Sequence, residues 1–116
     1  MDFESQQRAD IVANRDALPM LDHIFQAWHY NHDYLGARAS RQAIDLPGLY
    51  PQLSVKELAE IVKQVNSLWS EAYHYGDLAY LGEPHEQLFQ RMREHHPGFS
   101  DPTYQAVLRR GYFEAR

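Results

Sequence analysis

The most constraining feature of this sequence is a helix-start signal at residues 54–57, followed by a long apolar stripe. Ser54 and Glu57 form a capping box, in which each side chain accepts a hydrogen bond from the other residue's backbone amide. Apolar residues then recur at steps of three and four positions: Leu58, Val62, Val65, Trp69 and Ala72. Because an α-helix brings such positions to one face, we expect a helix over residues 55–75, ended by Gly76.

The same helical period recurs through the rest of the chain. A second long helix is expected near residues 17–35, with Asp16 as its N-cap and Trp28 in its apolar stripe. Shorter helices are expected near residues 4–14, 37–45, 84–96 and 101–111. The segment 46–51 contains two prolines and a glycine, which should break any helix. Gly111 is the expected end of the last helix.

These helices define the expected fold class. No segment alternates apolar and polar residues between turn signals, as a half-buried strand would. A chain of 116 residues is the size of one typical domain. The sequence therefore predicts an all-α fold, a compact single-domain bundle of five to six helices over residues 1–116.

Composition and charge exclude several classes of protein. The chain has no cysteine, which excludes disulfide scaffolds and thiolate metal sites. Its formal net charge is −5, whereas a general nucleic-acid binder needs a basic face to neutralise phosphates. No apolar run approaches the roughly 18 residues of a membrane-spanning helix, and the first residues are polar and acidic, unlike a signal peptide. We expect a cytoplasmic protein with no membrane contact.

The charges are unevenly divided along the chain. Residues 1–84 carry twelve acidic and six basic side chains, whereas residues 85–116 carry four acidic side chains and five arginines. Two helices with arginines and a short turn between them are compatible with a helix-turn-helix motif. The arginines are interleaved with Glu86 and Glu94, however, as on a solvated and salt-bridged face. We therefore expect no direct contact with nucleic acid.

No catalytic signature is present in the sequence. No serine lies in a Gly-x-Ser-x-Gly elbow, and the six glycines are scattered singly rather than gathered in a phosphate-binding loop. Ser54 and Ser100 are both explained as helix N-caps. The sequence therefore indicates that the protein is not an enzyme and uses no cofactor.

The aromatic residues point to a binding surface. Eight tyrosines, five phenylalanines and two tryptophans make up 13% of the chain. Tyr30 and Tyr75 fall off the apolar stripes of their helices, next to His29 and His74, so they are candidates for exposed anchors. Such rings give contact area at low entropic cost. Three acidic residues would surround them: Glu71, Glu60 and Asp33.

We therefore predict a small, non-enzymatic protein-binding module. Its acidic surface would steer it toward a basic partner protein, such as a nucleic-acid enzyme. In size and composition the chain is similar to bacterial or phage immunity proteins and inhibitors, although no shared motif carries this similarity. A homodimer formed through one apolar helix face is a further interpretation.

An alternative function is a helical domain that binds a metal ion or a small ligand. Neutral imidazole is the commonest metal ligand, and the candidate ligands are His29, His32, His74 and Glu71. Glu71 and His74 have the Glu-x-x-His spacing of di-iron bundles, but the second such motif of these bundles is missing. His74 also falls on the polar face of the helix expected over residues 55–75. These points favour the protein-binding module.

Overall fold

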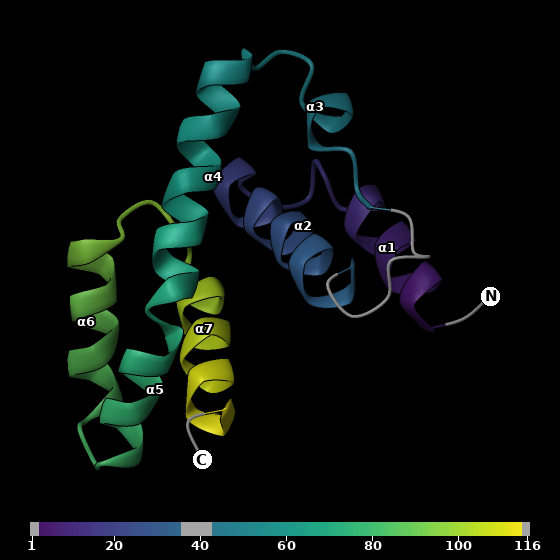
Figure 1. The fold of residues 1–116 in the computed structure, drawn as a ribbon. Coiled ribbons are helices and arrows are strands. Elements are labelled where there is room, and N and C mark those ends of the chain that lie inside the picture. Colours follow the sequence, from purple (N-terminus) through teal and green to yellow (C-terminus); the bar gives the residue numbers. More distant parts are fainter. Residues whose placement is uncertain (1–2, 36–42, 115–116) are drawn as a thin grey trace. The chain divides into compact units, whose positions relative to one another are not determined.

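The computed structural model describes residues 3–35 and 43–114, and within them it contains helices and no strand (Figure 1). The helices are α1 (Phe3–Ala13), α2 (Met20–Leu35), α3 (Leu46–Leu49), α4 (Val55–Ser70), α5 (Ala72–Tyr80), α6 (His85–His95) and α7 (Asp101–Glu114). The predicted all-α class is confirmed. Most of the helix expected near 37–45 lies outside the described residues, and residues 43–45 are not helical. None of the helices described is long and apolar enough to cross a membrane.

Contacts within the chain cluster into two compact units, residues 1–62 and 63–116. The boundary between the units falls inside α4. The single domain that the sequence predicts stays a prediction.

In the first unit, α2 packs against α1 and α3. The sequence predicts one apolar stripe along α2, but the consecutive residues Asp22, His23, Ile24 and Phe25 are all buried. Consecutive residues project in different directions from a helix, so α2 is covered on more than one side. The helix also begins at Met20, after Pro19, and not after Asp16 as predicted.

A reciprocal pair of hydrogen bonds fixes the segment before α3 to α2. The Asn31 side-chain amide donates to the Ile44 carbonyl at 3.0 Å, and the Ile44 amide donates to Asn31 Oδ1 at 2.8 Å. The next residues form one helical turn, α3, where the sequence predicts an interruption. Pro47 lies in the first turn of α3, where its missing N–H group costs nothing.

The capping box at the start of α4 is confirmed. The Glu57 amide donates to Ser54 Oγ at 3.0 Å, and the Ser54 amide donates to Glu57 Oε1 at 2.9 Å. The hydrogen bond that the Glu57 carboxylate accepts from the Ser54 amide, with a smaller contribution from the Ser54 side chain, holds the pKa of this carboxyl below its usual value. The helix predicted over 55–75 is interrupted, however, because Glu71 leaves helical geometry between α4 and α5.

Two glycines that the sequence marks as helix ends lie inside helices. Gly76 is within α5 and Gly111 is within α7, and both are buried. The two helices pack closely at these positions. A Cβ atom on Gly76 would overlap the backbone of Gly111, and one on Gly111 would overlap the carbonyl of Ala72. We call this contact the glycine crossing. Glycine serves here as a residue that permits two backbones to approach.

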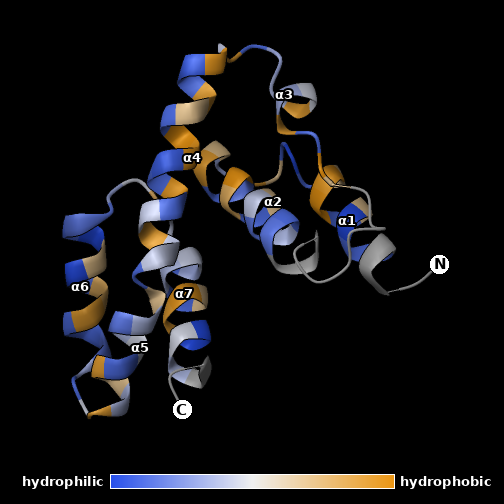
Figure 2. Cartoon of the chain, viewed as in Figure 1, coloured by the Kyte–Doolittle hydropathy of each residue, from blue (hydrophilic) through white to orange (hydrophobic). Residues whose placement is uncertain are grey.

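The helix α6 completes the second unit by packing against both α5 and α7. Leu88 and Met92 are fully buried on its apolar face, whereas most of its other residues are hydrophilic (Figure 2). From α7, Tyr104 is buried, and its hydroxyl donates to the His96 carbonyl at 2.5 Å. This bond holds the end of α6 against α7.

Candidate functional site

A pocket of about 460 Å³ lies in the second unit, among α5, α6 and α7. Its lining residues are Ala79, His85, Phe89, Gln105, Leu108, Arg109 and Tyr112. We call it the aromatic pocket. Ala79 and Leu108 are buried, whereas His85, Gln105 and Arg109 are exposed. The pocket therefore has an apolar floor and a polar rim.

Helical spacing explains why these side chains meet in the pocket. His85 and Phe89 are four residues apart on α6, so they lie one above the other, with ring centroids 6.3 Å apart in an edge-on arrangement. On α7, Gln105, Arg109 and Tyr112 follow one another at steps of four and three. Such residues share one face of a helix. The pocket is thus formed by one face of α6 and one face of α7, together with Ala79 of α5.

Two half-buried aromatic rings give the pocket flat apolar surfaces. The Arg93 guanidinium lies 6.0 Å from the centroid of the Phe89 ring, and Arg93 is itself paired with Asp101 at 3.1 Å. The Tyr112 ring is tilted against Tyr80, at 6.2 Å between centroids. With Arg109 and Gln105 as hydrogen-bonding groups on the rim, the pocket is suited to a planar ligand with polar edges.

A cluster of polar side chains joins the start of α5 to the end of α6. His96 Nε2 lies 3.1 Å from Glu71 Oε2, and the His96 ring is buried. The hydrogen bond from His96 lowers the pKa of the Glu71 carboxyl. Burial, with the nearby Glu71 charge, raises the pKa of Tyr75 to about 12. These contacts hold α5 and the end of α6 together.

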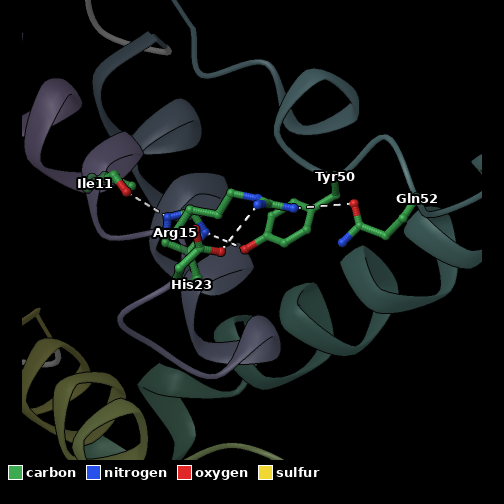
Figure 3. A network of polar contacts seen from close by, with 6 residues as sticks. Ile11, Arg15, His23, Tyr50 and Gln52 are labelled. Atoms are coloured by element: carbon green, nitrogen blue, oxygen red, sulfur yellow. Dashed lines mark hydrogen bonds and ion pairs between the residues drawn. The ribbon is translucent and has the colours of Figure 1, made fainter.

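The first unit contains a buried histidine in a network of polar contacts (Figure 3). His23 is 0% exposed, and its Nε2 lies 2.6 Å from the Ile11 carbonyl oxygen. A carbonyl only accepts, so Nε2 carries the proton, and in the neutral ring Nδ1 accepts from the Tyr50 hydroxyl at 2.5 Å. Burial raises the pKa of Tyr50, and Arg15 stacks 5.0 Å from the centroid of the Tyr50 ring.

This network is a structural one. His23 bridges α1, α2 and the end of α3, and both of its nitrogens are used. Arg15 also reaches Gln52 at 3.3 Å across the segment after α3. Both His23 nitrogens and the Tyr50 hydroxyl face protein partners, whereas Arg15 Nε is buried without a hydrogen-bond partner. The network therefore explains how the first unit is held together.

The structure corrects the expectation that Tyr30 and Tyr75 are exposed. Each is only 2% exposed, because its helix is covered beyond the apolar stripe that the sequence shows. His74 is exposed and its ring lies 5.5 Å from that of Tyr75. His29 is half-buried and stacks on Phe25 at 6.2 Å. The two rings predicted as surface anchors are therefore part of the buried interior.

The remaining predicted residues are spread over both units. Glu60 is exposed on α4, Glu71 is half-buried beside His96, and the Asp33 side chain lies outside the described residues. His32 is exposed, with its ring 3.9 Å from that of Trp28. Neither unit gathers three histidine, aspartate or glutamate side chains into a metal site among its described residues. The structure thus offers no support for the metal-binding alternative.

The aromatic pocket was not among the sites predicted from the sequence. Its residues carry a local signal, a ring pair four apart on α6 and a polar–aromatic face on α7. This signal becomes informative only once α6 and α7 are known to lie against each other. The short turn between the two helices brings them together, but the sequence does not show which of their faces meet.

Comparison with known proteins finds a similarity over most of the chain. The chain is 30% identical over 95 residues to the ribosomal RNA small subunit methyltransferase H of Legionella pneumophila, with the same match in the strains Corby, Paris and Philadelphia 1. The matched region covers 82% of this chain but only 27% of the length of these relatives. No protein-family model matches the chain. No solved structure matches it either.

This similarity overturns two predictions from the sequence. We expected a non-enzymatic protein-binding module similar to an immunity protein or inhibitor, and we expected no enzymatic activity. The similar proteins are methyltransferases, so the finding points toward an enzyme and both expectations are wrong. The two expectations rested on the lack of a local catalytic motif. The similarity extends over 95 residues and is seen only when the sequence is compared with those of other proteins.

Proposed function

We propose that this chain takes part in the methylation of small-subunit ribosomal RNA, as the part of such an enzyme that engages the RNA. The 95-residue similarity to an enzyme of that name carries the proposal, since it extends over 82% of this chain. The relatives are much longer, and the chain spans 27% of their length. We therefore propose for this chain only the contact with RNA, and not the whole activity of such an enzyme.

The described residues do not fit a site for the methyl donor. Nucleotide-type cofactors commonly bind at a glycine-rich loop that follows a strand of a parallel sheet. The described part of the chain has no strand, and its glycines stand singly in the sequence. We therefore assign no step of methyl transfer to these residues and assign them to contact with the RNA.

The acidic net charge limits the kind of RNA contact that is proposed. A charge of −5 disfavours broad binding to phosphates. Sequence-specific recognition of RNA relies largely on unpaired bases, which stack on aromatic rings and form hydrogen bonds through their edges. The aromatic pocket has both aromatic rings and hydrogen-bonding side chains. With ribosomal RNA as the proposed substrate, we also propose a cytoplasmic location for this chain.

The test is a comparison of ribosomal RNA from cells with and without the gene. Small-subunit RNA is purified from the deletion strain and from the parent, and its methylated nucleosides are mapped by mass spectrometry. We expect at least one methylation of the small-subunit RNA to fall in the deletion strain and to return when the gene is restored. Identical methylation profiles in the two strains would contradict the proposal.

A further inference from the structure

We propose that the aromatic pocket holds an unpaired nucleobase of single-stranded RNA. This inference rests on the proposed function, in which the chain engages small-subunit ribosomal RNA. It adds the site, which is the aromatic pocket, and the part of the RNA that binds there, which is an unpaired base.

The size and floor of the pocket fit a small planar ligand. Its volume of about 460 Å³ lies within the roughly 300–1,000 Å³ of typical small-molecule sites. Ala79 and Leu108, which are 9% and 4% exposed, form its apolar floor. The small side chain of Ala79 lies one helical turn from the glycine crossing at Gly76. The close approach of α5 and α7 therefore places this floor beside the lining residues of α7.

Aromatic rings enter the pocket from two different helices. Phe89 comes from α6 and Tyr112 from α7, and both are half-buried, so each is held in place while part of it remains accessible. Unpaired bases stack on such rings, and this stacking tolerates any base because every base has a flat π-face. Two rings on facing helices therefore provide stacking surfaces for one base.

The polar rim provides partners for the edge of a base and for its phosphate. The Gln105 amide both donates and accepts hydrogen bonds, and the Arg109 guanidinium presents five donors in one plane. His85 adds a ring nitrogen at the start of α6. These groups lie around the apolar floor, so a stacked base would meet hydrogen-bonding groups at its edge.

The charge of the pocket lining favours an anionic ligand at this place. Glu83 is paired with Arg91 at 2.5 Å, and Asp101 is paired with Arg93 at 3.1 Å. Both pairs lie on residues outside the pocket lining. Arg109 lines the pocket together with no acidic side chain. A nucleotide phosphate would therefore meet a positive charge at the rim, although the whole chain is acidic.

The experiment measures the binding of a fluorescein-labelled single-stranded RNA decamer to the purified protein by fluorescence anisotropy. Phe89→Ala and Tyr112→Ala should each weaken binding by about 5- to 150-fold, the range for loss of one stacked base. Gln105→Ala, at an exposed position, gives a variant that retains the fold and should also weaken binding. Arg109→Gln should weaken binding and reduce its salt dependence by about one phosphate contact.

Two matched variants control for general effects. Tyr73→Ala removes a tyrosine of α5 that is 57% exposed and outside the pocket lining, and Lys63→Gln removes an exposed positive charge from α4. Both should bind the decamer as the wild type does. Thermal unfolding of every variant confirms that the fold is retained. The same sequence as duplex RNA should bind more weakly, because its bases are already stacked.

Three results would overturn the pocket proposal. They are no binding of the decamer, equal losses in the pocket and control variants, and binding of adenosine monophosphate at the pocket without binding of RNA. The last result would assign the pocket to a free nucleotide.

Returning the pocket variants to the deletion strain separates this proposal from the proposed function. Lost RNA binding together with lost methylation supports both. Lost binding with full methylation retains the pocket as an RNA site and overturns its part in methylation, whereas the deletion strain alone tests the proposed function. Retained binding with lost methylation overturns the pocket.

Discussion

The two units of this protein are held together in different ways. In the first unit, polar side chains connect the segments: the buried His23 lies between Ile11 and Tyr50, and the half-buried Asn31 pairs with Ile44. In the second unit, α5 and α7 approach because Gly76 and Gly111 have no side chains, and hydrogen bonds of His96 with Tyr104 and Glu71 add to this contact. A buried hydrogen bond favours the packing that brings its donor to its acceptor. The glycine crossing favours the packing in which two helix backbones fit closely together. The aromatic pocket lies in the second unit, which contains the glycine crossing.

The largest effect should come from filling the glycine crossing. Gly→Ala inside a helix normally stabilises it by roughly 0.5–1 kcal/mol. At Gly76 or Gly111 the new methyl group overlaps backbone atoms that cannot rotate away, so we expect a loss of about 3 kcal/mol. Chemical denaturation measures the loss, and hydrogen exchange should place it in residues 63–116.

Gly48→Ala is the control for this prediction. The Cβ atom at this position would meet the end of the flexible Asp45 side chain, which can move. We expect little change in the free energy of unfolding. A stabilising effect of Gly76→Ala would show that α5 and α7 do not approach as described.

The polar network of the first unit provides the second prediction. Tyr50→Phe removes the hydroxyl that faces His23 Nδ1 and leaves a buried acceptor without a partner, which costs about 1–3 kcal/mol. Tyr73→Phe, at an exposed position, is the matched control and should cost almost nothing. Equal stability of the two variants would mean that His23 does not depend on this bond. Loss of protection from hydrogen exchange should be confined to residues 1–62.

The capping box should have a smaller effect. Ser54→Ala removes the acceptor of the Glu57 amide, and loss of an N-cap costs about 1 kcal/mol. Ser67→Ala, at an exposed position inside α4, should not destabilise the protein. Thermal unfolding of both variants tests the comparison, and equal melting temperatures would contradict it.

The smallest predicted effect is a dependence on pH that arises from Glu71. Because the folded state lowers the pKa of this carboxyl, chiefly through the hydrogen bond from His96, the ionised form stabilises the fold. This contribution is present above the ordinary pKa of 4.5 and is lost as the pH falls through the lowered folded value. Glu71→Gln should therefore flatten the acid side of the stability profile, measured by urea denaturation. Glu60→Gln, at an exposed position, should leave the profile unchanged.

Local signals explain which parts of this fold could be predicted. The capping box of Ser54 and Glu57 and the helical periods near 84–96 and 101–111 depend on residues close in sequence, and they match α4, α6 and α7. The roles of Gly76 and Gly111 could not be predicted in this way. A single sequence does not distinguish a glycine that ends a helix from a glycine that lets a neighbouring helix approach.

The candidate site depended on contacts between distant segments. Tyr30 and Tyr75 lie off the apolar stripes, yet both are buried because more than one face of each helix is covered. Conversely, Phe89 and Tyr112 have no motif in common and come together only through the packing of α6 on α7. The sequence therefore predicted the fold class but neither the buried tyrosines nor the pocket.

The most direct measurement of the central claim is the ratio of two dissociation constants for the single-stranded RNA decamer. One belongs to Phe89→Ala, within the aromatic pocket, and the other to Tyr73→Ala, outside it. If the pocket stacks an unpaired base, the first constant exceeds the second by about 5- to 150-fold. A ratio of one, in two folded proteins, would contradict the claim that this part of the chain engages RNA through the pocket.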